Sequence, residues 1–378
     1  MPARRVRERF SVAVILLAAL GLLPASCRGS SSPAPSTSGP SPSDRSDQSS
    51  QAGERSPSAS HGGLAVQDIR ETPVQVIPLL GPASERFAEL SGLAWHGDQL
   101  ILLPQYPDRL EPRNDGALYA IPEAALLAVV TGQSTDPITP RAIEFIAPDL
   151  ASRAPGMEGF EAIAFHGDRV FMTLEANLGD RMTGYLVAGT IAADHSRVVL
   201  DTDNVVEIPA QASVSNASEE SLLVTDDEVI TIYEANGANI NRSPRVHVFD
   251  HSLRPLGTRP FPTIEYRVID ATALDGDNRF WVMNYFFAGD RRLYNPAPDA
   301  IAAAHGKGAS HGASETVERL LLLEYRPSGI VRIDRPPVQL QLIDAGRNWE
   351  GLVRWQDHGF LLTTDMFPDT LLGFVPVE

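Results

Sequence analysis

The sequence has little cysteine, little lysine and little positive charge, and each shortage excludes a class of protein. Its single cysteine, Cys27, leaves no disulfide framework and no zinc or iron–sulfur site built from several cysteines. Its single lysine is Lys307, so arginine supplies nearly all of the positive charge. The formal net charge of −17 argues against a nucleic-acid partner, because phosphate binding needs a basic surface.

Several common catalytic motifs are also missing. The chain has no G-x-S-x-G elbow, no H-E-x-x-H pair, no Walker A loop and no G-x-G-x-x-G after a strand. Its longest apolar run, residues 10–23, is too short for a comfortable membrane-spanning helix. Any activity must therefore come from another arrangement of side chains.

The N-terminus has the features of an export signal. Four arginines within residues 4–9 precede the apolar run, and small residues follow it up to Cys27. Residues 1–27 resemble a bacterial lipoprotein signal, in which Cys27 would become the acylated first residue, although Pro24 stands where that motif usually has Leu. The resemblance implies an exported protein that is lipid-anchored to the cell envelope. A plain signal peptide with an incidental cysteine is the alternative.

The next segment predicts a tether. Residues 28–63 are rich in Ser, Pro and Gly and offer almost nothing to bury, so we expect them to be disordered. Residues 1–62 carry a net charge of +3 and the rest of the chain carries −20. The folded part, predicted as one domain over residues 64–378, is thus strongly acidic.

An internal repeat organises this domain. Each of five segments has an apolar alternating stretch, a tight turn and a second apolar stretch, and reads as a β-hairpin. Four of them begin with a small or acidic residue and end with an acid or amide 14 positions later, and the fifth has one extra residue in its turn. The five segments are residues 91–105, 161–175, 220–234, 270–284 and 350–365.

Further strand-like stretches follow each hairpin. A third appears in all five units and a fourth in the first four, while a spare one at residues 73–80 precedes the first unit. We therefore predict an all-β fold, a β-propeller of five four-stranded blades closed by the N-terminal strand. Six blades remain an alternative, because two repeats are 70 and 80 residues apart. Residues 294–315 look like a mobile insertion.

The hairpin geometry places the first and last residues of every repeat on one face, near the axis. Most of these residues are carboxylates, whose mutual repulsion requires protons, arginine counter-ions such as Arg267 and Arg347, or a bound cation. Ca²⁺ is the cation that such oxygen ligands favour. The predicted metal ligands are Glu161, Glu175, Glu220, Glu234, Asp270, Asn284, Glu350 and Asp365.

Arginines follow several of these hairpins closely. Arg181, Arg242 and Arg291 come within a few residues of a second strand, each beside an Asp or Asn. Because arginine captures phosphate and carboxylate groups well, these three are candidates for binding an anionic substrate. The alternative is that they are ordinary solvated turn residues.

Short motifs suggest a family. The segments ELSGLA (89–94), GFEAIA (159–164), IDATAL (269–274) with Trp281, and WEGLV (349–353) resemble the bacterial phytase-like propellers, also described as having esterase-like activity of phytase. The resemblance implies an envelope propeller that binds Ca²⁺ and acts on phosphoesters. The chain also resembles calcium-dependent lactonase propellers, which implies Glu161, Asn284 and Asp365 as ligands of one Ca²⁺.

Three functions follow as expectations. The first is a Ca²⁺-dependent hydrolase of phosphoesters or other esters, with Glu161 or Glu220 as base and an arginine on the anion. The second is a non-catalytic ligand- or protein-binding propeller, and the third is a structural envelope lipoprotein. We expect a monomer that takes a small anionic ligand and meets the membrane only through its lipid.

Overall fold

The structure, a computed structural model, describes residues 69–343 and 346–377. The predicted signal at 1–27, the lipidation at Cys27 and the tether at 28–63 lie outside these residues. Within the described part of the chain, no helix is long and apolar enough to cross a membrane.

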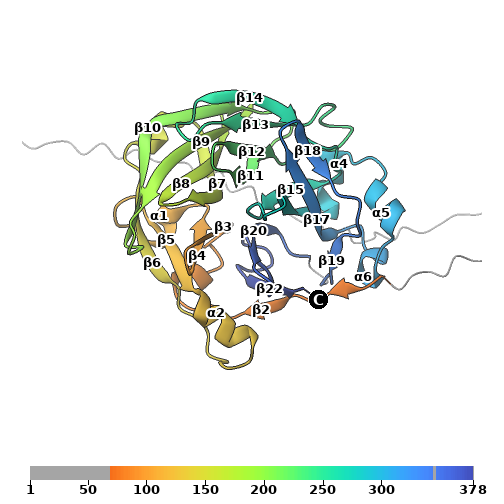
Figure 1. Cartoon of the computed structure of the whole chain (residues 1–378), viewed down its shortest axis with the longest axis horizontal. Coiled ribbons are helices and arrows are strands. Elements are labelled where there is room, and N and C mark those ends of the chain that lie inside the picture. The colour runs from red at the N-terminus through yellow and green to blue at the C-terminus, as the bar shows by residue number, and fades with distance from the viewer. Residues whose placement is uncertain (1–68, 344–345, 378) are drawn as a thin grey trace, which may run out of the picture. The chain divides into compact units, whose positions relative to one another are not determined.

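The described strands form a β-propeller. The strands surround a common centre, and each inner strand contacts the next, so that β3, β7, β11, β15 and β20 close a ring (Figure 1). The all-β propeller predicted from the repeat is therefore confirmed, and five inner hairpins line the ring. Every predicted hairpin is a pair of inner strands, because alternating apolar residues and a tight turn define a hairpin locally.

The first two blades share one eight-stranded sheet, because their outer strands β6 and β10 pair in parallel. Blade 1 consists of β3 (Leu90–His96), β4 (Gln99–Pro104), β5 (Ala117–Pro122) and β6 (Arg141–Ile146). Blade 2 consists of β7 (Met157–His166), β8 (Arg169–Asn177), β9 (Met182–Ile191) and β10 (Arg197–Pro209).

The other three blades are separate sheets. Blade 3 consists of β11 (Glu219–Val224), β12 (Val229–Tyr233), β13 (Arg245–Phe249) and β14 (Pro255–Pro260). Blade 4 consists of β15 (Arg267–Ala271), β16 (Arg279–Phe286), β17 (Val317–Arg326) and β19 (Val338–Leu340), with β18 (Gly329–Arg332) also paired to β17. Blade 5 contains β20 (Trp349–Trp355), β21 (Gly359–Thr364) and β22 (Leu372–Pro376).

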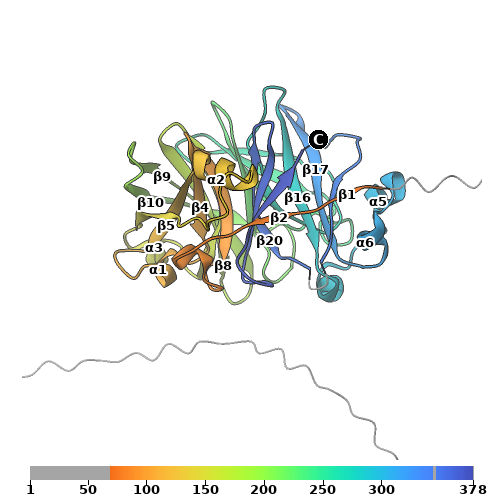
Figure 2. The same cartoon turned by 90° about the horizontal axis from the view of Figure 1, so that it is seen from below.

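The N-terminal strands complete the ring. Strand β2 (Gln75–Ile77) is the fourth strand of blade 5 and pairs antiparallel with β22. Strand β1 (Glu71–Thr72) adds to blade 4 through parallel pairing with β19. Figure 2 shows this segment running across the two blades. Closure by a strand within residues 73–80 agrees with the prediction, and it removes the free edge of the last blade.

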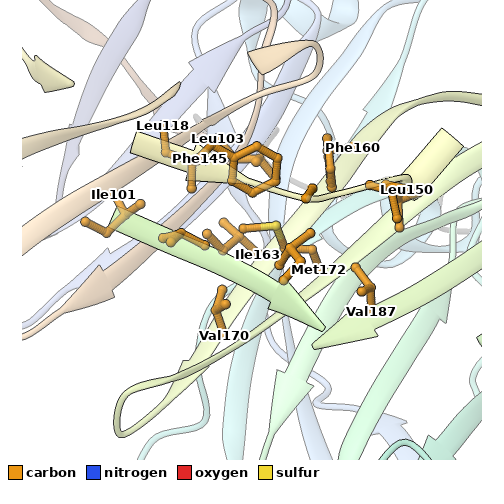
Figure 3. Close-up of a cluster of buried hydrophobic side chains, with 14 of the residues drawn as sticks. Ile101, Leu103, Leu118, Phe145, Leu150, Phe160, Ile163, Val170, Met172 and Val187 are labelled. Atoms are coloured by element: carbon orange, nitrogen blue, oxygen red, sulfur yellow. The ribbon is translucent and has the colours of Figure 1, made fainter. Parts of the chain in front are cut away.

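Apolar side chains fill the spaces between blades. Between blades 1 and 2, Phe145 meets Phe160 edge to face, with ring centroids 5.3 Å apart, and Ile163 and Met172 lie beside them (Figure 3). Complete burial of one such side chain contributes about 1.5–3 kcal/mol. The inner strands are apolar on both faces for this reason.

Each inner hairpin contains a bulge at the same repeat position. The register of β3 shifts between Leu90 and Gly92, and that of β20 shifts between Trp349 and Gly351. The other inner strands have equivalent shifts. A bulge takes a residue out of the ladder and re-aims its side chain. The residues within the bulges include Ser91, Glu161, Glu220, Asp270 and Glu350.

The short helices lie in connections. They are η1 (Pro82–Ser84), α1 (Pro107–Leu110), α2 (Glu123–Val130), α3 (Leu150–Arg153), η2 (Ala288–Asp290), α4 (Arg291–Tyr294), α5 (Ala300–His305) and α6 (Ala309–Gly312). Residues 294–315, expected to be a mobile insertion, differ from that expectation because they contain α5 and α6 and pack against blade 4.

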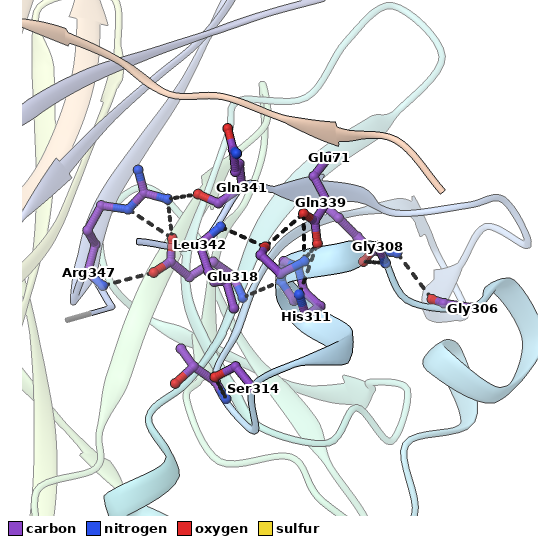
Figure 4. A network of polar contacts seen from close by, with 12 residues as sticks. Glu71, Gly306, Gly308, His311, Ser314, Glu318, Gln339, Gln341, Leu342 and Arg347 are labelled. Atoms are coloured by element: carbon purple, nitrogen blue, oxygen red, sulfur yellow. Dashed lines mark hydrogen bonds and ion pairs between the residues drawn. The ribbon is translucent and has the colours of Figure 1, made fainter. Parts of the chain in front are cut away.

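A polar network holds this segment. The Glu71 carboxylate of β1 accepts hydrogen bonds from Ser310 Oγ (2.7 Å) and His311 Nδ1 (2.8 Å), as well as from both backbone amides (Figure 4). Burial alone would raise the pKa of Glu71, but the hydrogen bonds from His311 and Ser310 outweigh it and lower the pKa to about 2. The insertion is therefore tied to the N-terminal strand.

Candidate functional site

A polar cavity of about 440 Å³ opens on the axis of the propeller, on the face where the inner hairpins begin and end. Seven of its lining side chains are carboxylates, while Arg267 is the one basic side chain among the described residues that line it. The lining residues are Glu89, Ser91, Gln105, Tyr106, Glu158, Glu161, Glu175, Asn216, Glu220, Arg267, Asn348, Glu350, Asp365 and Met366.

The structure brings together five of the eight predicted metal ligands. These five line the cavity and come from blades 2, 3 and 5; they are Glu161, Glu175, Glu220, Glu350 and Asp365. The bulges explain part of this convergence, since Glu161, Glu220 and Glu350 leave the ladder at the same repeat position.

The other three predicted ligands hold neighbouring structure. Asp270 accepts hydrogen bonds from the amides of Leu352 and Ala271, both at 2.7 Å, and so joins blade 4 to blade 5. Asn284 Oδ1 accepts a hydrogen bond from Arg319 Nε at 2.8 Å, and Asn284 Nδ2 donates one to the carbonyl of Arg267 at 2.9 Å. Glu234 pairs with Arg267 and accepts a hydrogen bond from Tyr294 at 2.9 Å.

Arg267 lies among these acids as a buried counter-ion. Besides the Glu234 contact, its Nη1 donates to Asn348 Oδ1 at 3.2 Å and its Nη2 lies 3.6 Å from Glu350 Oε1. Burial alone would lower the pKa of this side chain, but Glu350 and Glu220 outweigh it and raise the pKa. Arg267 therefore stays charged and fills the role of counter-ion that the sequence allowed for it.

Burial raises the pKa values of the cavity carboxyl groups and so favours their protonated forms. It raises the pKa of Glu161 well above its ordinary value, with help from Glu220 and Glu175. It also raises the pKa of Glu175 to about 7 and that of Glu220 to about 8, although Arg267 opposes both shifts. The cavity therefore retains protons at neutral pH, and its acids are not all ionised together.

These shifts predict a fall in stability as the pH rises. From pH 4.5 upward the unfolded chain releases protons that Glu175 and Glu220 keep until about pH 7 and 8. The free energy of unfolding should then fall by up to about 1.4 kcal/mol per pH unit for each retained proton. Glu175→Gln combined with Glu220→Gln should match the native chain at pH 5 and melt at a higher temperature at pH 8.

Thermal melts from pH 5 to pH 8 would measure this difference. Glu207→Gln provides the control, because that side chain is half-exposed and pairs only with Arg181 and Thr183 in its own blade. Parallel melting curves for the native chain and the double variant would contradict the shifted pKa values.

The described residues show no cluster of metal-ligating side chains. Within residues 69–343 and 346–377, no group of three or more His, Cys, Asp or Glu side chains is placed so that it could hold a metal ion. The Arg267 guanidinium already contacts Glu234 and Glu350. Calcium binding stays a prediction. The positive charge of Arg267 already offsets part of the repulsion between these acids.

The three predicted anion-binding arginines lie away from the cavity lining. Arg181 is exposed and pairs with Glu207 at 3.1 Å, and Arg291 is exposed and pairs with Glu315 at 3.1 Å. Arg242 is also exposed. Their charges therefore face solvent rather than the buried acids.

Several lining residues lie outside the set predicted from the repeat, but the sequence carries a signal for them. Glu89 and Asn348 each stand two positions before the first residue of a repeat, while Tyr106 and Met366 directly follow the last residue of one. Extending each repeat by these positions would have found all four. Glu158 stands three positions before its repeat, as Arg267 does, whereas Asn216 has no comparable repeat position.

Known proteins give little further guidance. No protein-family model matches the chain, and no curated protein matches it. Solved structures with some likeness include a Cellvibrio cellulosa alpha-L-arabinanase mutant, with 12% identity over 75% of this chain and 89% of that one and a TM-score of 0.41. A putative glycoside hydrolase from Parabacteroides distasonis has 11% identity over 83% and 95%, with a TM-score of 0.43.

An exo-1,5-alpha-L-arabinanase from a bovine ruminal metagenomic library is similar at the same level, with 11% identity over 79% of this chain and 94% of that one and a TM-score of 0.43. Structural similarity at this level does not support any statement about activity. These matches also give no support to the resemblance to phytase-like propellers.

Proposed function

We propose that this protein is a hydrolase that acts in its axial cavity through carboxyl groups, with an uncharged glycoside as substrate. The observation that carries the proposal is the shared position of Glu161 and Glu175 in one cavity, with pKa values raised to different extents. Pairs of acids separated in this way can divide the acid and base roles between them.

The lining chemistry favours an acetal over an ester. Ester hydrolysis commonly uses a nucleophile with an adjacent base, yet the described lining residues include no His, Lys or Cys, and Ser91 Oγ faces the carbonyl of Leu103 at 3.4 Å. Cleavage of a glycosidic bond needs one carboxylic acid and one carboxylate. The cavity supplies both.

The roles follow from the pKa directions. Glu161, whose pKa burial raises well above its ordinary value, donates its proton to the leaving-group oxygen as the glycosidic bond breaks. Glu175, with a pKa of about 7, takes a proton from the attacking water, which gives a free alcohol and a hemiacetal. Glu220, the other catalytic residue expected from the sequence, lines the same cavity; burial is the main cause of the raised pKa of Glu161, and Glu220 raises it further when it is ionised.

A phosphoester fits this cavity poorly. Its negative charges would meet a lining with seven acidic side chains, of which those that are ionised repel it, and one arginine whose charge Glu234 and Glu350 already share. Like charges about 4 Å apart repel by roughly 4 kcal/mol at an effective dielectric constant of 20. The cavity therefore favours an uncharged or cationic ligand over the anionic one expected from the sequence.

A panel of chromogenic substrates tests the proposal. The purified domain, residues 64–378, would be assayed with 4-nitrophenyl glycosides of several neutral sugars, 4-nitrophenyl acetate and 4-nitrophenyl phosphate, with and without EDTA. We expect glycoside turnover that EDTA does not change. Phosphate release that EDTA abolishes would overturn the proposal in favour of the calcium-dependent phosphoesterase, and sugar binding without turnover would favour a non-catalytic binding propeller.

We also propose that the protein is exported and anchored by a lipid on Cys27, with the domain held outside the cytoplasm as a monomer on the tether. The basic and apolar signal at residues 1–27 and the small residues before Cys27 support this. Cys27→Ser should abolish incorporation of labelled palmitate and move the protein from the membrane fraction to the soluble one. Unchanged fractionation would contradict the anchor.

A further inference from the structure

A second cavity, of about 340 Å³, shares a wall with the axial one. Gln105 and Tyr106 line both cavities, so the two are adjoining chambers rather than separate sites. The second chamber, here called the outer groove, lies between α1 and α3, where blades 1 and 2 meet.

The shared wall stands beside the proposed acid. Phe160 and Glu161 are consecutive on β7, yet Phe160 lines the outer groove and Glu161 lines the axial cavity. Gln105 Nε2 donates to Glu161 Oε1 at 3.1 Å, and the Gln105 carbonyl accepts the amide of Phe160 at 3.0 Å. Glu161 therefore lies at the boundary between the chambers.

The wall is also held in place. A Cβ on Gly159 would lie 2.4 Å from Gln105 Cγ, so only glycine leaves room for the Gln105 side chain there. The Arg109 guanidinium lies 3.3 Å from the centre of the Tyr106 ring, and its Nη1 donates to both oxygens of Glu89 at 3.0 and 3.1 Å. These contacts fix both residues of the wall.

The lining of the outer groove defines the chemistry of an occupant. Phe145, Phe160 and Leu150, labelled in Figure 3, form its buried apolar floor, and Met157 is half-buried beside them. The charged side chains among its described lining residues are all acidic: Asp108, Asp115 and Asp149. An apolar or aromatic group without negative charge suits this lining.

We propose that the outer groove binds the leaving-group half of the substrate, an uncharged aromatic or otherwise apolar alcohol, while the axial cavity holds the sugar. This inference rests on the proposed function. A general acid must reach the oxygen between the two halves of its substrate, and Glu161 is placed at the boundary that the two chambers share. The wall at Gln105 and Tyr106 then marks the bond that is cleaved.

The test fills the groove from its rim. Ala151 on α3 is exposed and lines the groove, so Ala151→Trp blocks it without entering the core. Ala303→Trp is the matched control, because Ala303 is exposed on α5, far along the chain in the insertion of blade 4. Each variant and the native chain would be compared on a benzyl glycoside and a methyl glycoside of the same sugar.

We expect Ala151→Trp to lower kcat/KM for the benzyl glycoside at least 10-fold and to leave the methyl glycoside within twofold of the native value. Ala303→Trp should change neither. An equal loss on both substrates, or no loss on either, would overturn the assignment of the groove.

A binding measurement separates the groove from the chemistry. Free benzyl alcohol would be titrated into the three proteins and followed by saturation-transfer NMR, which needs no turnover. Binding that Ala151→Trp abolishes and Ala303→Trp preserves supports the groove, whereas equal binding to all three overturns it. Absence of turnover on every glycoside overturns the proposed function and the leaving-group role, and the NMR result alone then reports whether the groove takes an aromatic alcohol.

Discussion

Replacing Glu161 with Gln should lower kcat on a glycoside with a poor leaving group by about 10²–10⁴-fold, the usual contribution of a general acid. Gln has nearly the same shape and can keep the contact with Gln105, but it has no proton to give. Burial raises the pKa of Glu161 and so favours the protonated form that a general acid needs. Steady-state kinetics on a methyl glycoside would measure the loss.

The leaving group distinguishes a general acid from a merely structural residue. With a dinitrophenyl glycoside, whose leaving group departs without a proton, the loss in Glu161→Gln should be much smaller. Glu207→Gln, which removes one exposed carboxylate elsewhere in blade 2, is the control and should retain full activity. An equal loss on both substrates would assign Glu161 to binding or folding instead.

Replacing Arg267 with Met should destabilise the domain by about 3–5 kcal/mol at pH 7, because removing one partner of a buried ion pair leaves the other without compensation. Glu234 and Glu350 would lose their contacts with the guanidinium. Glu220 would lose a nearby positive charge that lowers its pKa. At pH 5 these carboxyl groups can take up protons, so the cost should shrink. Urea unfolding at both pH values would measure it.

Arg291→Met is the matched control for this substitution. Its guanidinium is half-exposed and pairs with an exposed Glu315, and surface pairs of this kind contribute about 0–1 kcal/mol. A similar small effect of Arg267→Met at both pH values would show that the cavity acids do not depend on this arginine.

The same variant bears on calcium. In the native chain we expect millimolar Ca²⁺ and EDTA to give equal melting temperatures, because Arg267 already supplies the compensating charge. In Arg267→Met, the five converging carboxylates have no such partner, so Ca²⁺ should recover part of the lost stability by binding the native state. A Ca²⁺-specific rise in the native chain would instead support the calcium prediction made from the sequence.

The propeller could be predicted from sequence because its signals are local. Alternating apolar residues around turns such as HGD at 96–98 define each hairpin within about 15 residues. The spare strand at 73–80 and the missing fourth strand of the last unit are enough to infer closure. The structure adds which outer strands pair, such as β6 with β10, and this depends on contacts between blades.

The direction of each axial side chain could not be predicted, because it depends on the neighbouring blade. Glu220 and Asp270 occupy the same repeat position, and each lies at a bulge. Glu220 lines the cavity, whereas Asp270 turns to the amide of Leu352 in the next blade. Nothing within either hairpin distinguishes the two outcomes.

The arginines show the same limit. Arg181 and Arg291 follow the hairpins as closely as the pattern suggested, yet each finds an acid on the surface of its own blade. Arg267 stands at the start of an inner strand. Asn284 donates a hydrogen bond to its backbone carbonyl, and Glu234 pairs with its guanidinium. The sequence marked it only as a nearby charge, since its place at the centre arises from three blades together.

The repeated bulge separates the architecture of the molecule from its chemistry. A bulged residue makes no ladder contact of its own, so the sheet does not depend on which side chain stands there. The five positions already hold three different residue types, namely serine, glutamate and aspartate, in otherwise equivalent hairpins. Asp270 is the exception, because it joins blade 4 to blade 5. At the four positions that line the cavity, namely Ser91, Glu161, Glu220 and Glu350, single substitutions would alter the charge, reach and proton content of the cavity while the strand pairing stays the same. Such a scaffold can acquire a new specificity in single steps, without passing through unfolded intermediates.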